Sequence, residues 1–231
     1  MAVLFVLTLL LVFTSASLAH RALDAESDGL WVVGTGVLTH VFILVPVHAL
    51  GFAQHLDAWM LAGLATTLCG GALVTVFLRE GKGLFQHNTA AMGRRLQRLW
   101  TGLLRFVRRA GLPLSVGVVA AVGLWVWWVV ATTIAPPRGN SASLALHEPI
   151  VGFMLQHRDL LAVELPANLQ RINGVPRFGH MTQLWFAAFT GRTFVEWPNV
   201  FSHVLAVAAT YCLLRQTQAQ KSTAVAIAFC F

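Results

Sequence analysis

The chain has 231 residues, of which 57% are hydrophobic and 11% are charged, and its mean hydropathy is +0.69. Soluble domains carry about 25% charged residues, so this composition excludes an ordinary soluble enzyme and indicates an integral membrane protein. The formal net charge is +7, and eight of the 16 Lys and Arg residues fall between Arg79 and Arg109. A basic loop beside a membrane explains this charge without a nucleic-acid partner.

Four segments are apolar over the roughly 20 residues that a helix needs to cross a bilayer: residues 2–19, 30–53, 58–78 and 111–135. A shorter fifth segment covers 194–214, and a sixth begins at Thr223 and has nine residues by Phe231. We therefore expect an all-α, polytopic helical membrane protein with about five complete transmembrane helices, a partial sixth and interfacial amphipathic helices. Its expected parts are 1–110 and 111–231.

The first segment ends in "TSASLAH", which resembles a signal-peptidase site at Ala19. Cleavage there would leave the basic segment outside the cell, against the positive-inside rule. An uncleaved first helix with its N-terminus outside places 79–110 in the cytoplasm and the loop 136–193 outside. We therefore expect a protein of the bacterial cytoplasmic (inner) membrane. An aromatic belt on the outer side is expected from four tryptophans, Trp125, Trp127, Trp128 and Trp197.

The basic segment contains "RRLQRLWTGLLRFVRR", residues 94–109, whose apolar residues recur at helical spacing. This pattern predicts an amphipathic helix on the inner leaflet. Its opposite face carries four arginines that would bind anionic headgroups at about 1 kcal/mol each, Arg94, Arg98, Arg105 and Arg109. The alternative is a docking surface for an acidic partner protein.

Beyond the fourth span, "EPIVGFMLQHRDLLAVEL" predicts a helix along the outer interface, with Pro149 in its first turn. The polar residues 156–159 interrupt the apolar pattern, so we expect this helix to bend there. "NLQRINGVPRFGHM" follows, and its Asn-Gly and Val-Pro pairs predict a loop.

The motif "LALHEP", placed between an outward span, a surface helix and a returning span, resembles the first outer loop of the GT-C superfamily of membrane glycosyltransferases. That superfamily includes the protein O-mannosyltransferases and the lipid A aminoarabinose transferases, and its motif reads approximately D-[SA]-L-x-Y-H-x-P. Leu144, His147 and Pro149 match it. The resemblance covers about residues 111–231. It implies transfer of a sugar from a polyprenyl-phosphate donor on the outer face of the membrane.

The chain departs from this motif at its key position. The family aspartate corresponds to Ala142 and the family tyrosine to Leu146. Because alanine cannot accept a proton, the resemblance implies a catalytically incomplete protein. His147 and Glu148 remain as catalytic candidates. The alternative for Glu148 is a charge that favours a helix N-terminus, and for His147 an interfacial hydrogen bond.

Three further arginines are candidates for binding a lipid phosphate, namely Arg138, Arg171 and Arg177. Contact with outer-leaflet headgroups is the alternative. His40, His48 and His203 lie within or near spans. Tetrapyrrole ligation by His40 or His48 is conceivable, but hydrogen-bonded bundle histidines are commoner and no flanking pattern supports a cofactor. The cysteines, Cys69, Cys212 and Cys230, have no CxxC spacing and are expected to be small buried hydrophobes rather than metal ligands.

Two functions remain open at this point. The first is a GT-C-like transferase relative. The second is a non-catalytic transmembrane accessory or structural subunit, which would pack its spans against a larger membrane complex.

Overall fold

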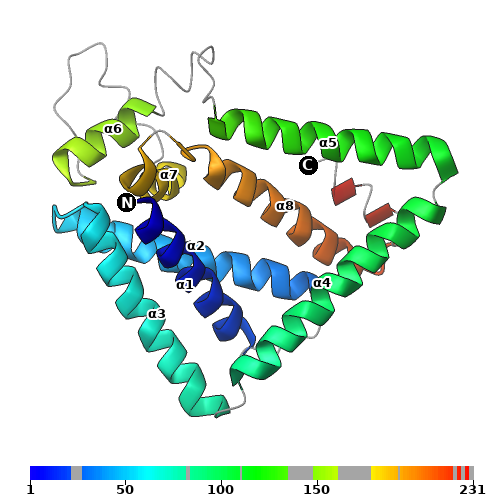
Figure 1. The fold of residues 1–231 in the computed structure, drawn as a ribbon, viewed down its shortest axis with the longest axis horizontal. Coiled ribbons are helices and arrows are strands. Elements are labelled where there is room, and N and C mark those ends of the chain that lie inside the picture. Colours follow the sequence, from blue (N-terminus) through cyan, green and yellow to red (C-terminus); the bar gives the residue numbers. More distant parts are fainter. Residues whose placement is uncertain are drawn as a thin grey trace.

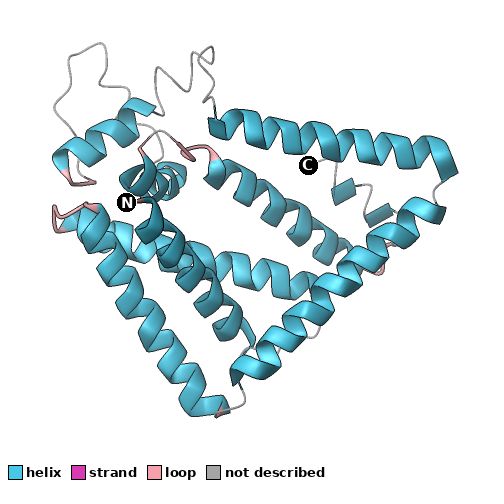
Figure 2. Cartoon of the chain, viewed as in Figure 1, coloured by secondary structure: helices cyan, strands magenta, loops and turns pink. Residues whose placement is uncertain are grey.

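The computed structural model describes residues 1–21, 28–81, 84–109, 111–134, 148–160, 178–191, 193–220, 223–224 and 227–228. Within these residues all regular structure is helical (Figure 2). The helices are α1 (Ala2–Arg21), α2 (Asp28–Phe52), α3 (Ala58–Glu80), α4 (Leu84–Arg109), α5 (Gly111–Ile134), α6 (Glu148–His157), α7 (Phe178–Thr190) and α8 (Trp197–Gln216). The predicted all-α polytopic fold is confirmed.

The predicted spans correspond to helices of the structure. Four described helices are long and apolar enough to cross a membrane, over Ala2–Ala19, Gly29–Phe52, Ala58–Glu80 and Trp197–Gln216. The predicted fourth span is α5, 24 residues long, in which the described apolar stretch is Val119–Ala131. The predicted partial sixth helix falls mostly outside the described residues, which there include only 223–224 and 227–228.

The core of the bundle lies where α1 packs along both α2 and α3, close to α7 (Figure 1). Phe5 near the start of α1 contacts Phe186 edge-on, with the ring centroids 5.5 Å apart, and lies 5.8 Å from the ring of Phe189. Trp185 is completely buried in the same apolar cluster. These contacts make α7 a central element of the core.

The interior position of α7 corrects the prediction of a loop over residues 168–181. Residues 178–181 belong to α7 instead, and α7 is buried at 180, 182–187 and 189. Its 13 residues rise only about 20 Å, which is too short for a bilayer of about 30 Å. A search for spans by length therefore passes over this helix.

Helix α8 lies antiparallel to α2 in a regular register. A Cβ on Gly29 would meet Cys212 Sγ, and a Cβ on Gly36 would overlap the side chain of Leu205. One turn further along α2, the ring of His40 stacks on Phe201, with centroids 4.9 Å apart and planes at 19°. Each step forward along α2 is thus matched by an equal step back along α8. The two glycines bring the helices together, as small residues do in membrane proteins.

Three helices end in the same backbone motif. At these ends the residues with left-handed φ are Gln54 (60°), two residues after α2, Arg158 (57°), directly after α6, and Gln218 (61°), two residues after α8. In each case the next amide donates to a carbonyl five residues back, His55 to Leu50 at 2.8 Å, Asp159 to Met154 at 3.2 Å and Ala219 to Leu214 at 3.1 Å. This is the Schellman pattern. It stops α6 at His157, so the predicted bent continuation is wrong over 158–160.

The end of α6 is hydrogen-bonded to the turn between α2 and α3. The amide of Leu56 donates to the carbonyl of Arg158 at 3.1 Å, and the amide of Leu160 donates to that of Gly51 at 3.3 Å. We call this end of the molecule, with α6 and the α2–α3 turn, the turn end. The opposite end, where α4 passes the start of α2 and the end of α8, is the arginine end (Figure 1).

Candidate functional site

The catalytic candidates of the outer segment are only marginally within the described structure. Helix α6 begins at Glu148, with Pro149 in its first turn as the sequence predicts. The side chain of Glu148 and the whole of His147 lie outside the described residues, and so does Ala142. The same holds for the phosphate-binding candidates, Arg138, Arg171 and Arg177. No described contact joins these residues into a site.

The described histidines of α2 have local structural partners. His40 Nδ1 donates to the Gly36 carbonyl at 3.1 Å, and His48 Nδ1 donates to the Leu44 carbonyl at 2.8 Å. The two histidines are eight residues apart, or about 12 Å along the helix, so they do not converge on one ion. Among the described residues, no group of three or more His, Cys, Asp or Glu side chains could hold a metal ion.

His203 differs from the α2 histidines because its side chain is exposed on α8, within a candidate span. Ionisable side chains inside a membrane are costly and normally face protein or a water-filled cavity. An exposed histidine at this place therefore marks a surface that suits contact with another polar group.

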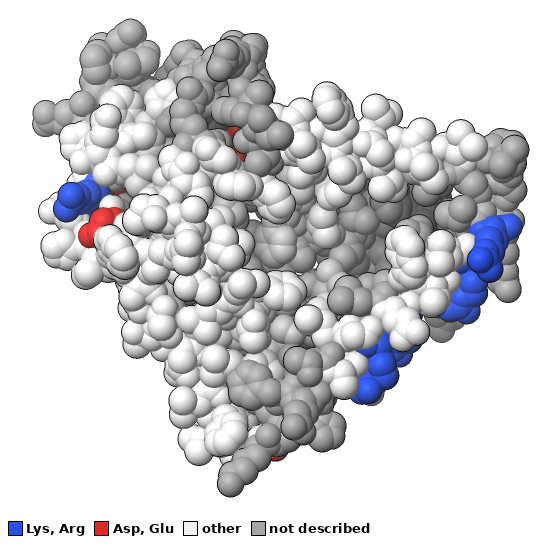
Figure 3. Space-filling model, in the orientation of Figure 1, with Lys and Arg blue, Asp and Glu red and all other residues white. Residues whose placement is uncertain are grey.

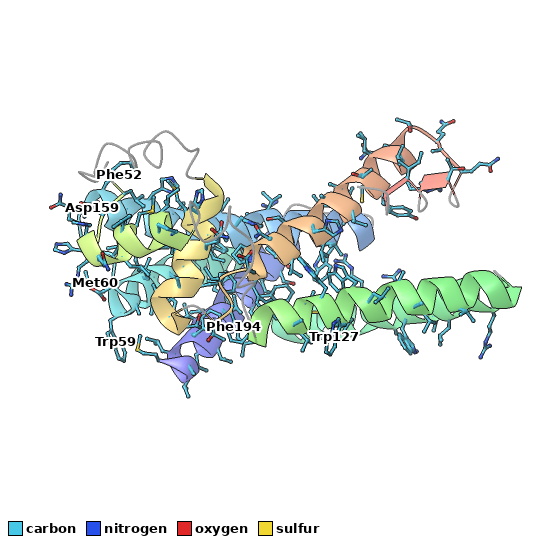
Figure 4. All side chains as sticks on the ribbon, turned by 90° about the horizontal axis from the view of Figure 1, so that it is seen from above. Phe52, Trp59, Met60, Trp127, Asp159 and Phe194 are labelled. Atoms are coloured by element: carbon cyan, nitrogen blue, oxygen red, sulfur yellow. The ribbon has the colours of Figure 1, made fainter. Side chains whose placement is uncertain are left out.

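Helix α5 stands apart from the bundle. All ten residues from 119 to 128 are exposed, and because ten residues make almost three helical turns, every face of α5 is open there. Leu124 and Trp127, one turn apart, are each 69% exposed. Trp127 projects from the side of α5 remote from α8 (Figure 4). The main contacts of α5 within the chain are with α4 and α8.

Helix α4 carries a line of exposed arginines. It extends over 84–109, ten residues further towards the N-terminus than the predicted amphipathic segment. Arg94, Arg98 and Arg105 are exposed as predicted, and Arg108 is exposed as well. The side chain of Arg109 lies outside the described residues. Basic side chains follow the edge of the molecule formed by α4 (Figure 3).

The sequence interpretation did not single out two further arginines of α4. Arg108 shares the exposed face, which a helical projection of 94–109 would have shown. Arg95 does not, because its guanidinium lies over the ring of Trp31, 5.3 Å from the centroid. This cation–π contact joins α4 to the start of α2, and no signal in the sequence pairs the two residues.

Comparison with known proteins does not assign the chain to a family. No protein-family model, no curated protein and no solved structure matches it.

Proposed function

We propose that the chain is a non-catalytic transmembrane subunit, which packs α5 against transmembrane helices of a larger membrane complex. The observation that carries this proposal is the exposure of α5 on every face over 119–128. A helix that is apolar all round requires an apolar environment on all sides, and its own chain supplies little of it.

The depth of the tryptophans on α5 favours protein over lipid as that environment. Trp127 lies about 7 Å from the midpoint of the 24-residue helix by its rise per residue, whereas the half-thickness of the hydrocarbon layer is about 15 Å. Tryptophans that anchor a helix in lipid gather at the headgroup level, so the depth of Trp127 departs from the aromatic belt that the sequence predicts for it. Tryptophan is also enriched among the residues that dominate protein interfaces.

The exposed His203 supports the same proposal from α8. A partner helix that covers this face would supply a hydrogen-bond partner, and such bonds across membrane helices contribute about 0.6–2 kcal/mol. In this proposal the arginine end faces the cytoplasm of a bacterial inner membrane, because basic segments remain inside. The segment 136–193 then lies outside.

Photo-crosslinking in native membranes tests the subunit proposal. A photoreactive residue placed at Leu124 or Trp127 should give one discrete protein adduct, reproducibly and in high yield. The matched control is Leu7, which is 60% exposed on α1 and should label lipid. His203→Leu should lower the yield from position 127 without lowering the amount of protein. Lipid adducts alone from all three positions would contradict the proposal.

A transferase remains the second candidate because of the order of the elements. An apolar helix, the His-Pro motif, a short helix and a returning span follow one another in the order that the GT-C resemblance implies. This candidate requires a polyprenyl-phosphate sugar and a role for His147 or Glu148. Sugar transfer by the purified protein that is lost in His147→Ala would favour it over the subunit proposal.

A further inference from the structure

One side of α8 carries polar and small side chains at alternating spacings of four and three residues. At about 100° per residue, five residues lie within about 40° of a common line along the helix, Asn199, His203, Ala206, Thr210 and Leu213. Thr210 is half-buried and the other four are exposed. We call these five residues the α8 stripe.

The α8 stripe lies on the side of α8 that is turned away from α2. The residues of α8 that meet α2 are Phe201, Leu205 and Cys212, about 140° around the helix from the stripe. Helix α5 comes close to α8 only near the first turns of α8, and the two helices diverge from there (Figures 1 and 4). The rest of the bundle therefore leaves the α8 stripe open.

The polar members of the α8 stripe lie at the depth of the hydrocarbon layer. Helix α8 has 20 residues and rises about 30 Å, which equals the thickness of that layer. From the start of α8, His203 lies about 9 Å along the axis and Thr210 about 20 Å. Acyl chains offer no hydrogen-bond partner at these depths.

His203 has the strongest need for a partner from outside α8. A threonine hydroxyl can donate to a carbonyl of its own helix. An imidazole has two ring nitrogens, and a carbonyl of its own helix engages only one of them, as at His40 and His48. The second ring nitrogen of His203 therefore requires a partner that α8 does not supply.

The α8 stripe is complementary to a second copy of itself. From 197 to 214 the sequence has no Asp, Glu, Lys or Arg, so two copies of this surface meet without like charges. An amide, a neutral imidazole and a hydroxyl each have a donor and an acceptor, so the same group on a second helix is a suitable partner. Asn199 donates one amide hydrogen to Glu196 Oε2 at 2.6 Å and keeps its carbonyl oxygen as an acceptor.

We propose that two copies of the chain pair through the α8 stripe, and that His203 of each copy forms a hydrogen bond with His203 of the other. Copies enter the membrane in one orientation, so their α8 helices are parallel and each position meets its own equivalent across a two-fold axis. The spacing of four and three suits helices that cross at about 20°, and Ala206 permits close approach.

This inference rests on the subunit proposal for the idea that α8 has a partner in the membrane, and it names that partner as a second copy. It concerns a surface other than α5. The two proposals can therefore fail separately.

Disulfide crosslinking in native membranes tests the pairing. Two differently tagged copies are expressed together in a background without Cys69, Cys212 and Cys230. Ala206→Cys places a thiol on the α8 stripe, and Ala208→Cys is the matched control about 160° around the same helix. A disulfide requires Cα atoms within about 7 Å. Oxidation should therefore convert most of the Ala206→Cys chain into a product with both tags and leave Ala208→Cys monomeric.

Energy transfer between labelled full-length chains in lipid vesicles measures the strength of the pairing. His203→Leu should weaken the dimer about three- to 30-fold, because hydrogen bonds across membrane helices contribute about 0.6–2 kcal/mol and 1.4 kcal/mol is tenfold. His203→Gln keeps a donor and an acceptor and should retain most of the affinity. The helical circular dichroism spectrum should be the same in both variants.

Three outcomes would overturn the pairing. These are equal crosslinking of Ala206→Cys and Ala208→Cys, no product with both tags, or full dimer affinity in His203→Leu. If one of them occurs while Leu124 or Trp127 of α5 still gives a discrete protein adduct, the subunit proposal stands and the partner of α8 is another protein. A dimer through α8 with only lipid adducts from α5 would contradict the α5 proposal alone.

Discussion

Gly36 marks the closest approach between α2 and α8, since a Cβ at this position would overlap the isobutyl group of Leu205. Gly36→Leu should therefore separate the two helices and lower the free energy of unfolding by about 1–3 kcal/mol, the usual cost of overpacking. An SDS unfolding titration from mixed micelles measures the change.

Gly63→Leu is the matched control for this prediction. Gly63 lies on α3, and a Cβ there meets nothing within 4 Å. The control should change stability by less than about 0.5 kcal/mol, as surface substitutions do. Equal destabilisation by the two variants would show that the loss comes from residue type and not from the α2–α8 contact.

The role of a residue could be predicted from the sequence where that role depends only on its neighbours along the chain. The expectation that α2 histidines are bundle histidines is consistent with the bonds to the Gly36 and Leu44 carbonyls, which need only one turn of helix. The stack of His40 on Phe201 could not be predicted. It joins residues 161 positions apart in the sequence, and no local pattern contains that distance.

At the scale of the elements, apolar length identified the long apolar helices to within a few residues, because crossing a bilayer is a requirement that each segment meets alone. Helix ends were harder to predict. A Schellman end is normally marked by glycine, but here the left-handed positions are held by Gln54, Arg158 and Gln218. The sequence did not identify α7 for two reasons. Other helices of the chain bury it, and it is too short to match the length of a bilayer-spanning segment.

Gln54→Gly should stabilise the protein by about 0.5–1 kcal/mol. Glycine removes the cost of about 1–2 kcal/mol that a residue with a side chain has in the left-handed conformation. Part of this gain is lost because glycine gives the unfolded chain more conformational entropy. Gln216→Gly makes the same substitution at the last residue of α8 and should destabilise by up to about 1 kcal/mol. Thermal unfolding of both variants, which should shift in opposite directions, checks the assignment.

At the scale of the whole molecule, the sequence predicts that the arginine end and the turn end lie on opposite sides of the membrane. The packing of the helices is consistent with this arrangement. The predicted orientations of the second and fifth spans are opposite, and α2 and α8 are antiparallel. The hydrogen bonds of α6 to the α2–α3 turn place a segment of the second part against the first. The parts 1–110 and 111–231 are separate in the sequence, but buried residues of both belong to one hydrophobic core.

Cysteine labelling across the membrane tests this two-ended arrangement most directly. Single cysteines are placed at Gln54 on the turn end, and at Thr101 and Gln218 on the arginine end, in a background without Cys69, Cys212 and Cys230. An impermeant maleimide should label position 54 from one side of sealed vesicles and positions 101 and 218 from the other side only. Labelling of all three positions from the same side would contradict the membrane-spanning bundle.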